Sequence, residues 1–505
     1  MLAKITSGAV VGLDSVPITV EVDIASQGLP SFTIVGLPDK AVEESKERVR
    51  AAIKNSGADF PPKRITVNLA PADLPKEGPA YDLPIALGIL VASGQLPGDF
   101  SDSLFFGELS LDGSLRYTNG ILPQAMLASA EGLKKLFVPS VNAKEAAVIR
   151  GVQAFPVENL ISLFNHLSSL KKIKAYPHTA INFELDSQSE FDMKDIRGQE
   201  TAKRALEIAA AGGHNVLMKG PPGAGKTLLA RTFPSILPSL TFEEAIEITK
   251  IYSVLGNLAN EPIIRKRPFR SPHHTASAVG LIGGGSHPKP GEISLAHRGV
   301  LFLDEFPEFP RFVLESLRAP LEDGFVTVSR AQGSIRFPAN FVLIAASNPC
   351  PCGFLGDNRR NCTCAPGQII RYQKRLSGPI LDRIDIHLEI PAVKMEKLTA
   401  DFESESSKTV RTRVQKAREL ALRRFKKTGI FSNAQMRSKD VKEICKLSSD
   451  SLDLLRRAIV TMKLSARGYI RVLKISRTIA DLEDSESILS HHVAESLQYR
   501  PRIEL

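Results

Sequence analysis

The chain lacks the long apolar runs that mark membrane-spanning helices. No stretch of about 18 consecutive apolar residues occurs in its 505 residues. The N-terminal residues Met1–Thr6 also lack the basic region and apolar core of a signal peptide. We find neither an internal repeat nor a low-complexity tract. These absences predict a cytoplasmic protein with no membrane partner.

Cysteine is scarce, with five residues in the whole chain, which excludes a secreted scaffold stapled by disulfides. Four of them, Cys350, Cys352, Cys362 and Cys364, form a C-x-C-x9-C-x-C cluster. Thiolates at this density in a reducing compartment favour a tetrahedral Zn²⁺ site. The C-x-C spacing is tighter than the usual C-x2-C, so free thiols packed in a loop are the alternative. We expect Cys445 to be a core residue.

Length and charge set broad limits. A chain of 505 residues is too long for one hydrophobic core, so roughly two to four domains are expected. A hydrophobic content of 43% and a charged content of 24% are ordinary for a soluble globular protein. The net charge of +10 favours a polyanionic partner such as nucleic acid, although many soluble proteins are equally basic.

Shifts in pattern divide the chain into four segments. Residues 1–165 contain short strand-like runs and helical stretches and predict an α+β domain. Residues 166–191 mix Ser, Pro, Lys and Asp without a sustained period and predict a linker. Residues 192–393 alternate helices with continuous apolar runs, the pattern of a parallel sheet covered on both faces. Residues 394–505 predict an all-helical domain. Its helices are expected near residues 408–427, 438–446, 450–463 and 468–483.

The most informative motif is the run Gly220, Pro221, Pro222, Gly223, Ala224, Gly225, Lys226 and Thr227. It matches the phosphate-binding pattern G-x-x-x-x-G-K-[ST] and lies between a strand-like and a helix-like run, as that pattern requires. Such a turn brings backbone N–H groups and the positive end of a helix dipole onto one point, where a polyphosphate binds. We expect Lys226 to reach the β- and γ-phosphates of a nucleotide and the Thr227 hydroxyl to hold Mg²⁺.

Polar residues follow the next two apolar runs of this segment. Asp304 and Glu305 come directly after Leu301–Leu303. We expect Asp304 to complete the Mg²⁺ shell and Glu305 to orient or deprotonate the attacking water. The alternative is that the acidic pair only caps the next helix. Asn348 follows the apolar run 341–346 and would place an amide beside the γ-phosphate.

The order of these motifs resembles the AAA+ ATPases. The Leu-Asp-Arg segment that contains Arg383 follows Asn348, and Arg467 opens a helix in the C-terminal domain. By this resemblance Asn348 is sensor one, and Arg383 is a finger that reaches the γ-phosphate of a neighbouring subunit. Arg467 is sensor two, with Arg471 as second candidate because it lies one helical turn further on. An arginine finger that acts on the nucleotide of a neighbouring subunit implies a ring. By resemblance this ring is a homohexamer.

Two further segments resemble the magnesium-chelatase and MCM branch of that family. Residues 267–297 form an insertion before the acidic strand, and a predicted β-hairpin precedes the sensor strand. The resemblance places both at the pore of the ring, where Arg330 and Arg336 of the hairpin would contact a phosphate backbone. The alternative is a solvated hairpin edge. In the insertion, we expect a structural role for His273 and His274 rather than metal binding.

The N-terminal domain resembles the S5-like fold of Lon-type proteases, on residues 75–87 and 106–113. In those proteases a serine and a lysine form the nucleophile and the base. Ala80 and Leu122 stand at the matching places in this chain. We therefore expect a catalytically inactive domain that serves assembly or DNA engagement.

Over essentially all 505 residues, including GLPDKAVEESKERVRAAI near the start, the chain closely resembles the ComM/YifB family of magnesium-chelatase-like AAA+ proteins. The resemblance implies an ATP-driven hexameric DNA helicase that promotes branch migration while transforming DNA is integrated. The stretch 408–427 has nine basic residues and one acidic residue, which suits a nucleic-acid partner. It is equally well explained as an amphipathic lid helix. Such a helix would pack through Val410, Val414, Ala417 and Ala421.

Two other functions are compatible with parts of the sequence. One is a magnesium-chelatase motor subunit that drives Mg²⁺ insertion into a porphyrin, and the other is an ATP-dependent protease. The additional N-terminal domain and the cysteine cluster argue against the first. Ala80 and Leu122 argue against the second, because neither side chain can act as a nucleophile or take a proton.

Overall fold

The chain forms two compact units. The computed structural model describes residues 2–178, 190–258, 261–285, 288–330, 333–357, 360–392, 404–426 and 429–501. Unit 1 consists of Met1–Asn182 and Phe242–Ile264, and unit 2 of Phe183–Thr241 and Arg265–Leu505. Part of the predicted linker (179–189) and the first residues of the predicted helical domain (394–403) lie outside the described residues. No helix in the described ranges is long and apolar enough to cross a membrane.

Unit 1 contains a four-stranded sheet in the order β1-β2-β4-β3. Its strands are β1 (Leu2–Val11), β2 (Asp14–Ile24), β3 (Ser31–Val35) and β4 (Arg64–Ala70). Strand β2 forms because apolar residues alternate, and Ile18, Val20 and Val22 are all fully buried. Helices α1 (Lys40–Asn55) and α2 (Asp82–Ala92) add their apolar faces to the same core. In α2, a Cβ on Gly88 would lie 2.4 Å from Val22 Cγ2, so glycine permits the close contact.

A second, parallel sheet of unit 1 has the order β5-β8-β9. Its strands are β5 (Ser103–Phe105), β8 (Lys135–Pro139) and β9 (Gln153–Val157), with helices α3 (Ile121–Ala130) and α5 (Leu160–Leu167) beside them. The rings of Phe105, Phe137 and Phe155 stack at centroid separations of 4.8 and 4.9 Å across the three strands. This aromatic stack aligns the short strands in register.

Helix α8 (Phe242–Leu255) departs from the domain boundaries expected from the sequence, which place 192–393 in one ATPase domain. It belongs to unit 1 because its end is tied to α3 and its surroundings. Ser253 Oγ donates to Glu145 Oε1 at 2.5 Å, and the backbone N–H of Leu122 donates to the same oxygen at 2.8 Å. Gly120 N also donates to Ser253 O at 3.0 Å. Burial raises the pKa of the Glu145 carboxyl, although these hydrogen bonds oppose the rise.

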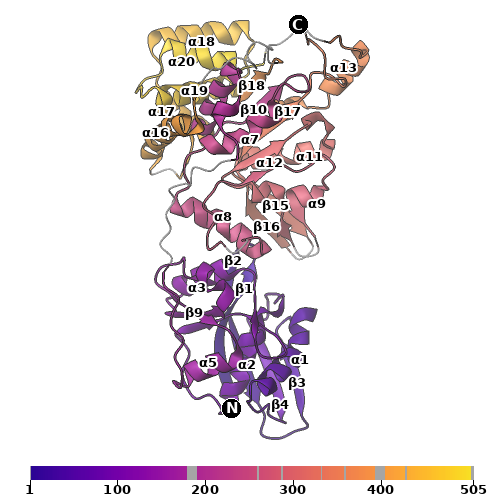
Figure 1. Cartoon of the computed structure of the whole chain (residues 1–505), viewed down its shortest axis with the longest axis vertical. Helices are drawn as coiled ribbons and strands as arrows, with labels where there is room; N and C mark the ends of the chain where they lie inside the picture. Colours follow the sequence, from indigo (N-terminus) through magenta and orange to yellow (C-terminus); the bar gives the residue numbers. More distant parts are fainter. Residues whose placement is uncertain are drawn as a thin grey trace. The chain divides into compact units, whose positions relative to one another are not determined.

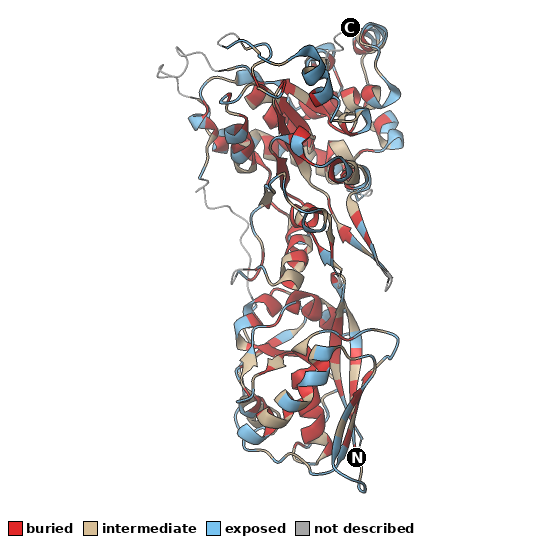
Figure 2. Cartoon of the chain, turned by 90° about the vertical axis from the view of Figure 1, so that its right-hand side faces the viewer, coloured by how far each residue is buried: buried red, intermediate tan, exposed pale blue. Residues whose placement is uncertain are grey.

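Unit 2 is built on a five-stranded parallel sheet, as the continuous apolar runs predict, in the order β11-β14-β17-β10-β18. The strands are β10 (Val216–Lys219), β11 (Phe269–Arg270), β14 (Val300–Leu303), β17 (Val342–Ser347) and β18 (Ile386–Glu389). Every residue of β14 is buried, so both faces of the sheet are covered. Figure 1 labels β10, β17 and β18 among the helices of the same unit, and Figure 2 shows buried residues along the strands of this unit.

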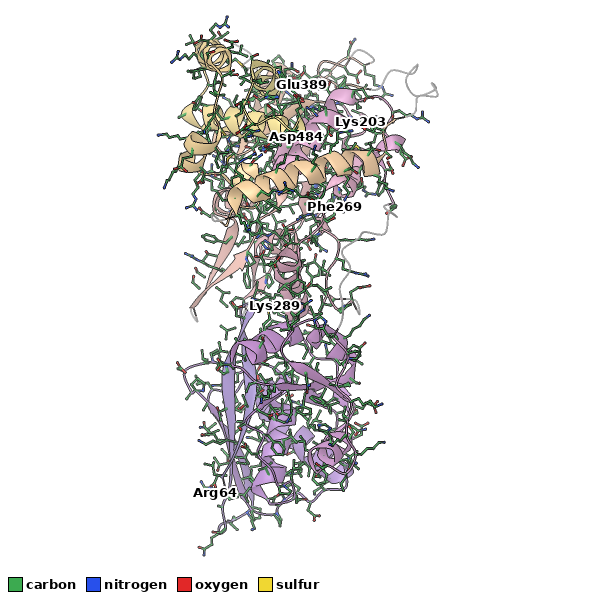
Figure 3. All side chains as sticks on the ribbon, turned by 90° about the vertical axis from the view of Figure 1, so that its left-hand side faces the viewer. Arg64, Lys203, Phe269, Lys289, Glu389 and Asp484 are labelled. Carbon is green, nitrogen blue, oxygen red and sulfur yellow. The ribbon has the colours of Figure 1, made fainter. Side chains whose placement is uncertain are left out.

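The C-terminal helices lie in unit 2 with the sheet. They are α16 (Ser407–Phe425), α17 (Ser438–Ile444), α18 (Ser449–Thr461), α19 (Ala466–Leu482) and α20 (Ser490–Gln498). The first four confirm the expected helices to within a few residues, whereas α20 was not expected. Helices α16 and α19 contribute to the core of the sheet, and the others pack in a second core. The predicted apolar face of α16 is buried. Its basic face is largely paired within the chain, for example Arg413 with Glu207 at 2.6 Å and Lys416 with Asp484, labelled in Figure 3, at 2.8 Å.

These pairs favour the interpretation of α16 as an amphipathic lid helix. Arg424 contributes a further contact, since its guanidinium bonds to Asp481 of α19 at 2.5 Å. Asp481 also accepts from Arg477 at 3.1 Å and from Asn433 at 2.8 Å. The side chains of Arg477 and Asp481 are each only 2% exposed. The buried Asp481 carboxylate therefore joins α16 and α19 to the segment that contains Asn433.

Replacing this carboxylate tests how much the network stabilises the fold. We expect Asp481→Ala to lower the free energy of unfolding of unit 2 by about 3–5 kcal/mol, because it leaves the charge of Arg477 buried without its partner. The matched control is Asp453→Ala, which breaks an exposed pair with Arg456 and should cost no more than about 1 kcal/mol. Urea unfolding followed by circular dichroism measures both. Equal effects of the two substitutions would contradict the prediction.

Candidate nucleotide-binding site

The predicted phosphate loop connects β10 to helix α7 (Lys226–Ile236). Gly223 and Gly225 have φ angles of 74° and 89°, in the left-handed region that residues with a Cβ avoid. At Gly220 the constraint is space, because a Cβ there would lie 2.2 Å from the carbonyl oxygen of Ile390. The first N–H groups of α7 have no earlier carbonyl in the helix to bond. The loop thus has the backbone of an anion-binding turn.

Strand register brings the motif residues together. Lys219, just before the phosphate loop, pairs with Ser347, just before Asn348. In the neighbouring pair of strands, Leu303 is opposite Ala345. Because the strands are parallel, the residues that follow them lie at the same edge of the sheet.

Lys226 meets Asn348 at this edge. Its Nζ donates to the carbonyl oxygens of Gly220 and Pro221 at 2.7 and 2.9 Å, and to Asn348 Oδ1 at 3.1 Å. Burial of the ammonium group lowers the pKa of Lys226, while Asp304 partly offsets this. The lysine is therefore held in place by three oxygens at the mouth of the loop.

Thr227 and Asp304 also meet, with Thr227 Oγ1 donating to Asp304 Oδ2 at 2.9 Å. A hydroxyl and a carboxylate so placed are hard oxygen ligands that suit Mg²⁺. The next residue, Glu305, has a φ of 51°, a left-handed conformation that is costly for a residue with a Cβ. This backbone conformation turns the Glu305 side chain away from the direction that it would have if β14 continued.

His274 contacts the same acidic pair. Its Nδ1 lies 3.0 Å from Glu305 Oε2. The preceding His273 bonds to Thr275 Oγ1 at 2.8 Å, and the two rings lie 4.1 Å apart. This bond lies within the loop, and the structural role expected for His273 stays a prediction. No sequence pattern connects His274 with Glu305, because β11, which ends four residues before His274, is too short to be recognised from its pattern.

Arg383 and Arg467 share one partner that has no motif of its own, Glu322 of α12 (Arg318–Asp323). Arg383 Nη2 lies 2.6 Å from Glu322 Oε2, and Arg467 Nη2 lies 3.7 Å from Glu322 Oε1. The side chain of Arg383 is 6% exposed, and its Nη1 also donates to the carbonyl oxygen of Pro379. Arg467 is 60% exposed. The two arginines predicted to contact phosphate are therefore neighbours.

Arg471, the second candidate for sensor two, has a different partner. Its Nη1 bonds to Asp385 Oδ1 at 2.7 Å, and His214 Nδ1 lies 3.5 Å from the other oxygen. Burial alone would raise the pKa of Asp385, but Arg471 and His214 outweigh it and lower the pKa below its usual value. Arg471 thus neutralises a buried carboxylate next to the sheet.

The predicted hairpin is present as β15 (Phe325–Arg330) and β16 (Gly333–Pro338), which pair antiparallel. Arg336 lies over the ring of Phe325, 4.6 Å from its centroid. The turn residues 331–332 and the side chain of Arg330 lie outside the described part of the chain. In the insertion before β14, Arg270 and Glu292 form a two-bonded ion pair at 2.6 Å.

In unit 1, the two positions that match the protease nucleophile and base are packed into the core. Ala80 is 7% exposed and Leu122 is fully buried. Lys76, a few residues before Ala80, is also fully buried, and its Nζ donates to the carbonyl oxygen of Pro71. Burial lowers the pKa of Lys76. Both matching positions therefore hold buried apolar side chains.

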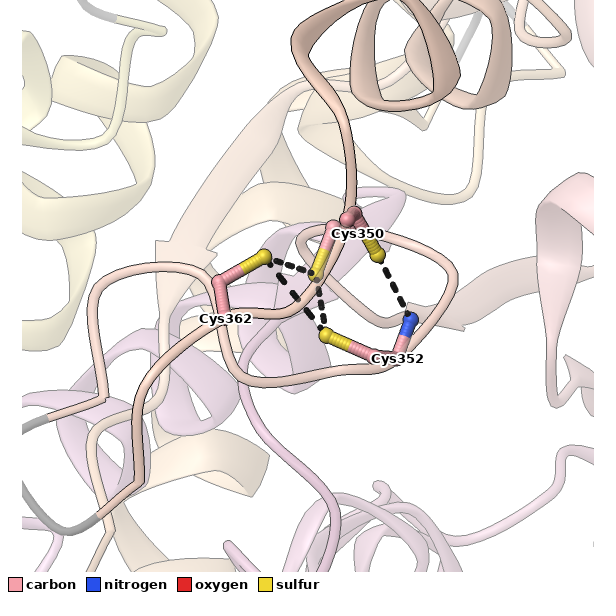
Figure 4. A group of neighbouring side chains, drawn as sticks. Cys350, Cys352 and Cys362 are labelled. Atoms are coloured by element: carbon pink, nitrogen blue, oxygen red, sulfur yellow. Dashed lines mark hydrogen bonds between the residues drawn. The ribbon is translucent and has the colours of Figure 1, made fainter.

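The four clustered cysteines lie close together and carry free thiols (Figure 4). The backbone N–H of Cys352 donates to Cys364 Sγ at 3.4 Å. Backbone hydrogen bonds from Phe354 and Thr363 lower the pKa of the Cys352 thiol to about 5. Cys445, the residue that follows α17, is buried as expected.

Comparison with known proteins gives matches along nearly the whole chain. The family model described as magnesium chelatase, subunit ChlI, matches residues 192–398, and those described as subunit ChlI of Mg-chelatase and as the ChlI C-terminal part match 20–142 and 404–500. Competence protein ComM of Haemophilus influenzae is 45% identical over 100% of this chain and 98% of its own length.

Other relatives differ in how much of the chain they share. YifB of Escherichia coli is 45% identical over 99% of this chain and 97% of its own length. The magnesium-chelatase subunit ChlI of Olisthodiscus luteus is 26% identical over only 41% of this chain and 59% of its own length. The full-length similarity is therefore to ComM and YifB, and the chain belongs to the ComM/YifB family of magnesium-chelatase-like AAA+ proteins.

Proposed function

We propose that the chain is a cytoplasmic ATPase that assembles into a homohexameric ring and moves DNA, as a helicase that promotes branch migration in recombination during natural transformation. The observation that carries the proposal is the meeting of Lys226 with Asn348, and of Thr227 with Asp304, at one edge of the sheet. The name of the 45% identical competence protein supports the link to transformation.

In this proposal, the residues 220–227 bind ATP. Lys226 holds the β- and γ-phosphates, and Asn348 positions the attacking water beside them. Thr227 and Asp304 hold Mg²⁺, which when bound neutralises charge that develops on the phosphate oxygens. Glu305 orients or deprotonates the water, and His274 restrains its carboxylate until hydrolysis.

Arg383 and Arg467 act in this proposal on the nucleotide of a neighbouring subunit. They share Glu322, so one anion already satisfies both guanidinium groups within a single chain. A γ-phosphate offers the same kind of partner with more charge. In an assembled ring, the γ-phosphate of the neighbouring subunit would compete with Glu322 for Arg383, which is buried within the single chain.

DNA contact is assigned to the hairpin of β15 and β16. Arg336 supplies a positive charge there, and its stacking on Phe325 fixes the direction of the side chain. Arg330 is the second expected contact. The net charge of +10 suits a polyanion. We assign the protease-like unit 1 to assembly or DNA engagement rather than to peptide hydrolysis.

A magnesium-chelatase motor is the second candidate. It is favoured by the descriptions of the three matching family models. The similarity to the ChlI subunit covers only 41% of this chain, however, whereas the similarity to ComM covers all of it. The two functions differ in what should stimulate ATP turnover, namely DNA or a porphyrin with partner subunits.

Substitutions at the site should separate binding from hydrolysis. We expect Lys226→Ala to weaken ATP binding by at least about tenfold, because the loop loses its phosphate-bound cation. Glu305→Gln should keep the affinity but lower the rate of hydrolysis by about 10²-fold. Lys194→Ala, at an exposed lysine of the same unit, is the control. Fluorescent-nucleotide titration and phosphate release measure the two quantities, and full activity of Lys226→Ala would refute the assignment.

A mixing experiment tests the role of Arg383 in trans. Arg383→Ala and Lys226→Ala should each be inactive alone. In randomly mixed rings, about a quarter of the sites would join an intact phosphate loop to an intact arginine, so activity should partly return. Native mass spectrometry verifies that both variants enter the same rings. No recovery in verified mixed rings would show that Arg383 does not act on a neighbour.

DNA dependence tests the motor. We expect forked or single-stranded DNA to stimulate ATP hydrolysis, and neither porphyrin with chelatase partner subunits nor unfolded protein to do so. The double variant Arg330→Ala, Arg336→Ala should bind DNA more weakly. The slope of its log binding constant against log salt concentration should correspond to about one to two fewer released ions. Arg456→Ala, which removes an exposed arginine of α18, is the control. Absence of DNA binding by the ATP-loaded ring would overturn the helicase proposal.

A further inference from the structure

The cysteine cluster lies in a segment that has little else to hold its shape. Residues 349–365 connect β17 to α13 (Pro366–Gln373), and their described part contains no helix or strand. Only Pro349, Cys350 and Gly353 in that part are buried. So small a core does not stabilise one conformation by itself, and another constraint is needed.

The sulfur atoms have the spacing of a metal site. All four lie within 4.8 Å of one another. Cys350 Sγ is 3.4 Å from Cys352 Sγ, and Cys362 Sγ is 3.6 Å from each of them (Figure 4). A tetrahedral ion with Zn–S bonds of about 2.3 Å separates its ligands by about 3.8 Å. A disulfide would require about 2.05 Å, so the spacing fits a shared ion and not a covalent pair.

We propose that the four clustered cysteines bind one Zn²⁺ as thiolates and that this ion fixes the loop against the phosphate loop. Thiolate is a soft ligand that selects Zn²⁺ over the Mg²⁺ expected beside ATP. Four protein ligands leave no open coordination position, so the ion is structural and not catalytic.

The loop touches the nucleotide site through Gly353, the residue after Cys352. A Cβ on Gly353 would lie 2.6 Å from Pro222 Cδ of the phosphate loop and 3.8 Å from Asn348 Cγ. On the other side, Gln373 Nε2 of α13 donates to the carbonyl oxygen of Pro349 at 3.3 Å. Anchoring the sulfur atoms therefore supports both Pro222 and the amide that meets Lys226.

This coupling rests on the proposed ATPase function, whereas the zinc site does not. Removing the residues that orient the ligands of a metal typically costs about 10–100-fold in metal affinity or activity. We expect an effect of similar size when the support behind the nucleotide site is lost. Removal of zinc should therefore weaken nucleotide binding without removing any residue that touches the nucleotide.

Metal content of the full-length chain tests the site directly. Protein purified without a metal-affinity step should contain one zinc per chain by inductively coupled plasma mass spectrometry. Metal-free protein titrated with Co²⁺ should develop the absorption of tetrahedral thiolate-bound cobalt, complete at one equivalent. Little zinc as purified, together with no binding of added ZnCl₂, overturns the proposal.

Variants locate the ion. The double variant Cys352→Ser, Cys364→Ser should lose zinc, whereas Cys445→Ala, which removes the cysteine outside the cluster, should keep it. Cys364→His should also keep it, because imidazole is a zinc ligand. Circular dichroism establishes that each variant is folded. Zinc retained at one per chain in the double variant would place the ion elsewhere.

The coupling has its own readout. After chelation of zinc from folded wild-type protein, affinity for a fluorescent ATP analogue should fall by about tenfold or more and return when ZnCl₂ is added. Unchanged affinity in folded, zinc-free protein overturns the coupling. If zinc-loaded protein binds no ATP at all, the proposed function fails while the zinc site stands.

Discussion

The register of three parallel strands is the constraint on which the site depends. Lys219 pairs with Ser347, and Leu303 with Ala345, so three motifs that lie up to 128 residues apart, from Gly220 to Asn348, end at one edge. The contacts of Lys226 with Asn348 and of Thr227 with Asp304 follow from that alignment. Every residue of β14 is buried. A shift of its register by one residue would turn each side chain to the opposite face of the sheet, and the close packing on both faces opposes such a shift.

Much of unit 2 was predictable because its signals are local. The glycines of the phosphate loop, the apolar runs and the first four lid helices each carry their own pattern. The placement of α8 was not predictable, because an amphipathic helix shows which face is apolar but not which core accepts it. Its bond from Ser253 to Glu145 joins residues 108 positions apart. Ser253 and Glu145 belong to no motif, so only tertiary structure reveals that they meet.

The arginines show a second limit of sequence reasoning. Motif order singles out Arg383 and Arg467, yet it says nothing of Glu322, which pairs with both. Two guanidinium groups near each other repel unless an anion lies between them. Glu322 fills that role within the chain. The pairing also explains how Arg383 can be buried in the folded chain, since removing an arginine from water requires a bonded partner.

The chain order links the two units more closely than a single linker would. The chain crosses between them after Asn182, after Thr241 and after Ile264. The last two crossings enclose α8 and lie between α7, which carries Lys226, and β14, which precedes Asp304. The segment that separates the phosphate loop from Asp304 along the sequence is therefore held in unit 1, through the bond from Ser253 of α8 to Glu145.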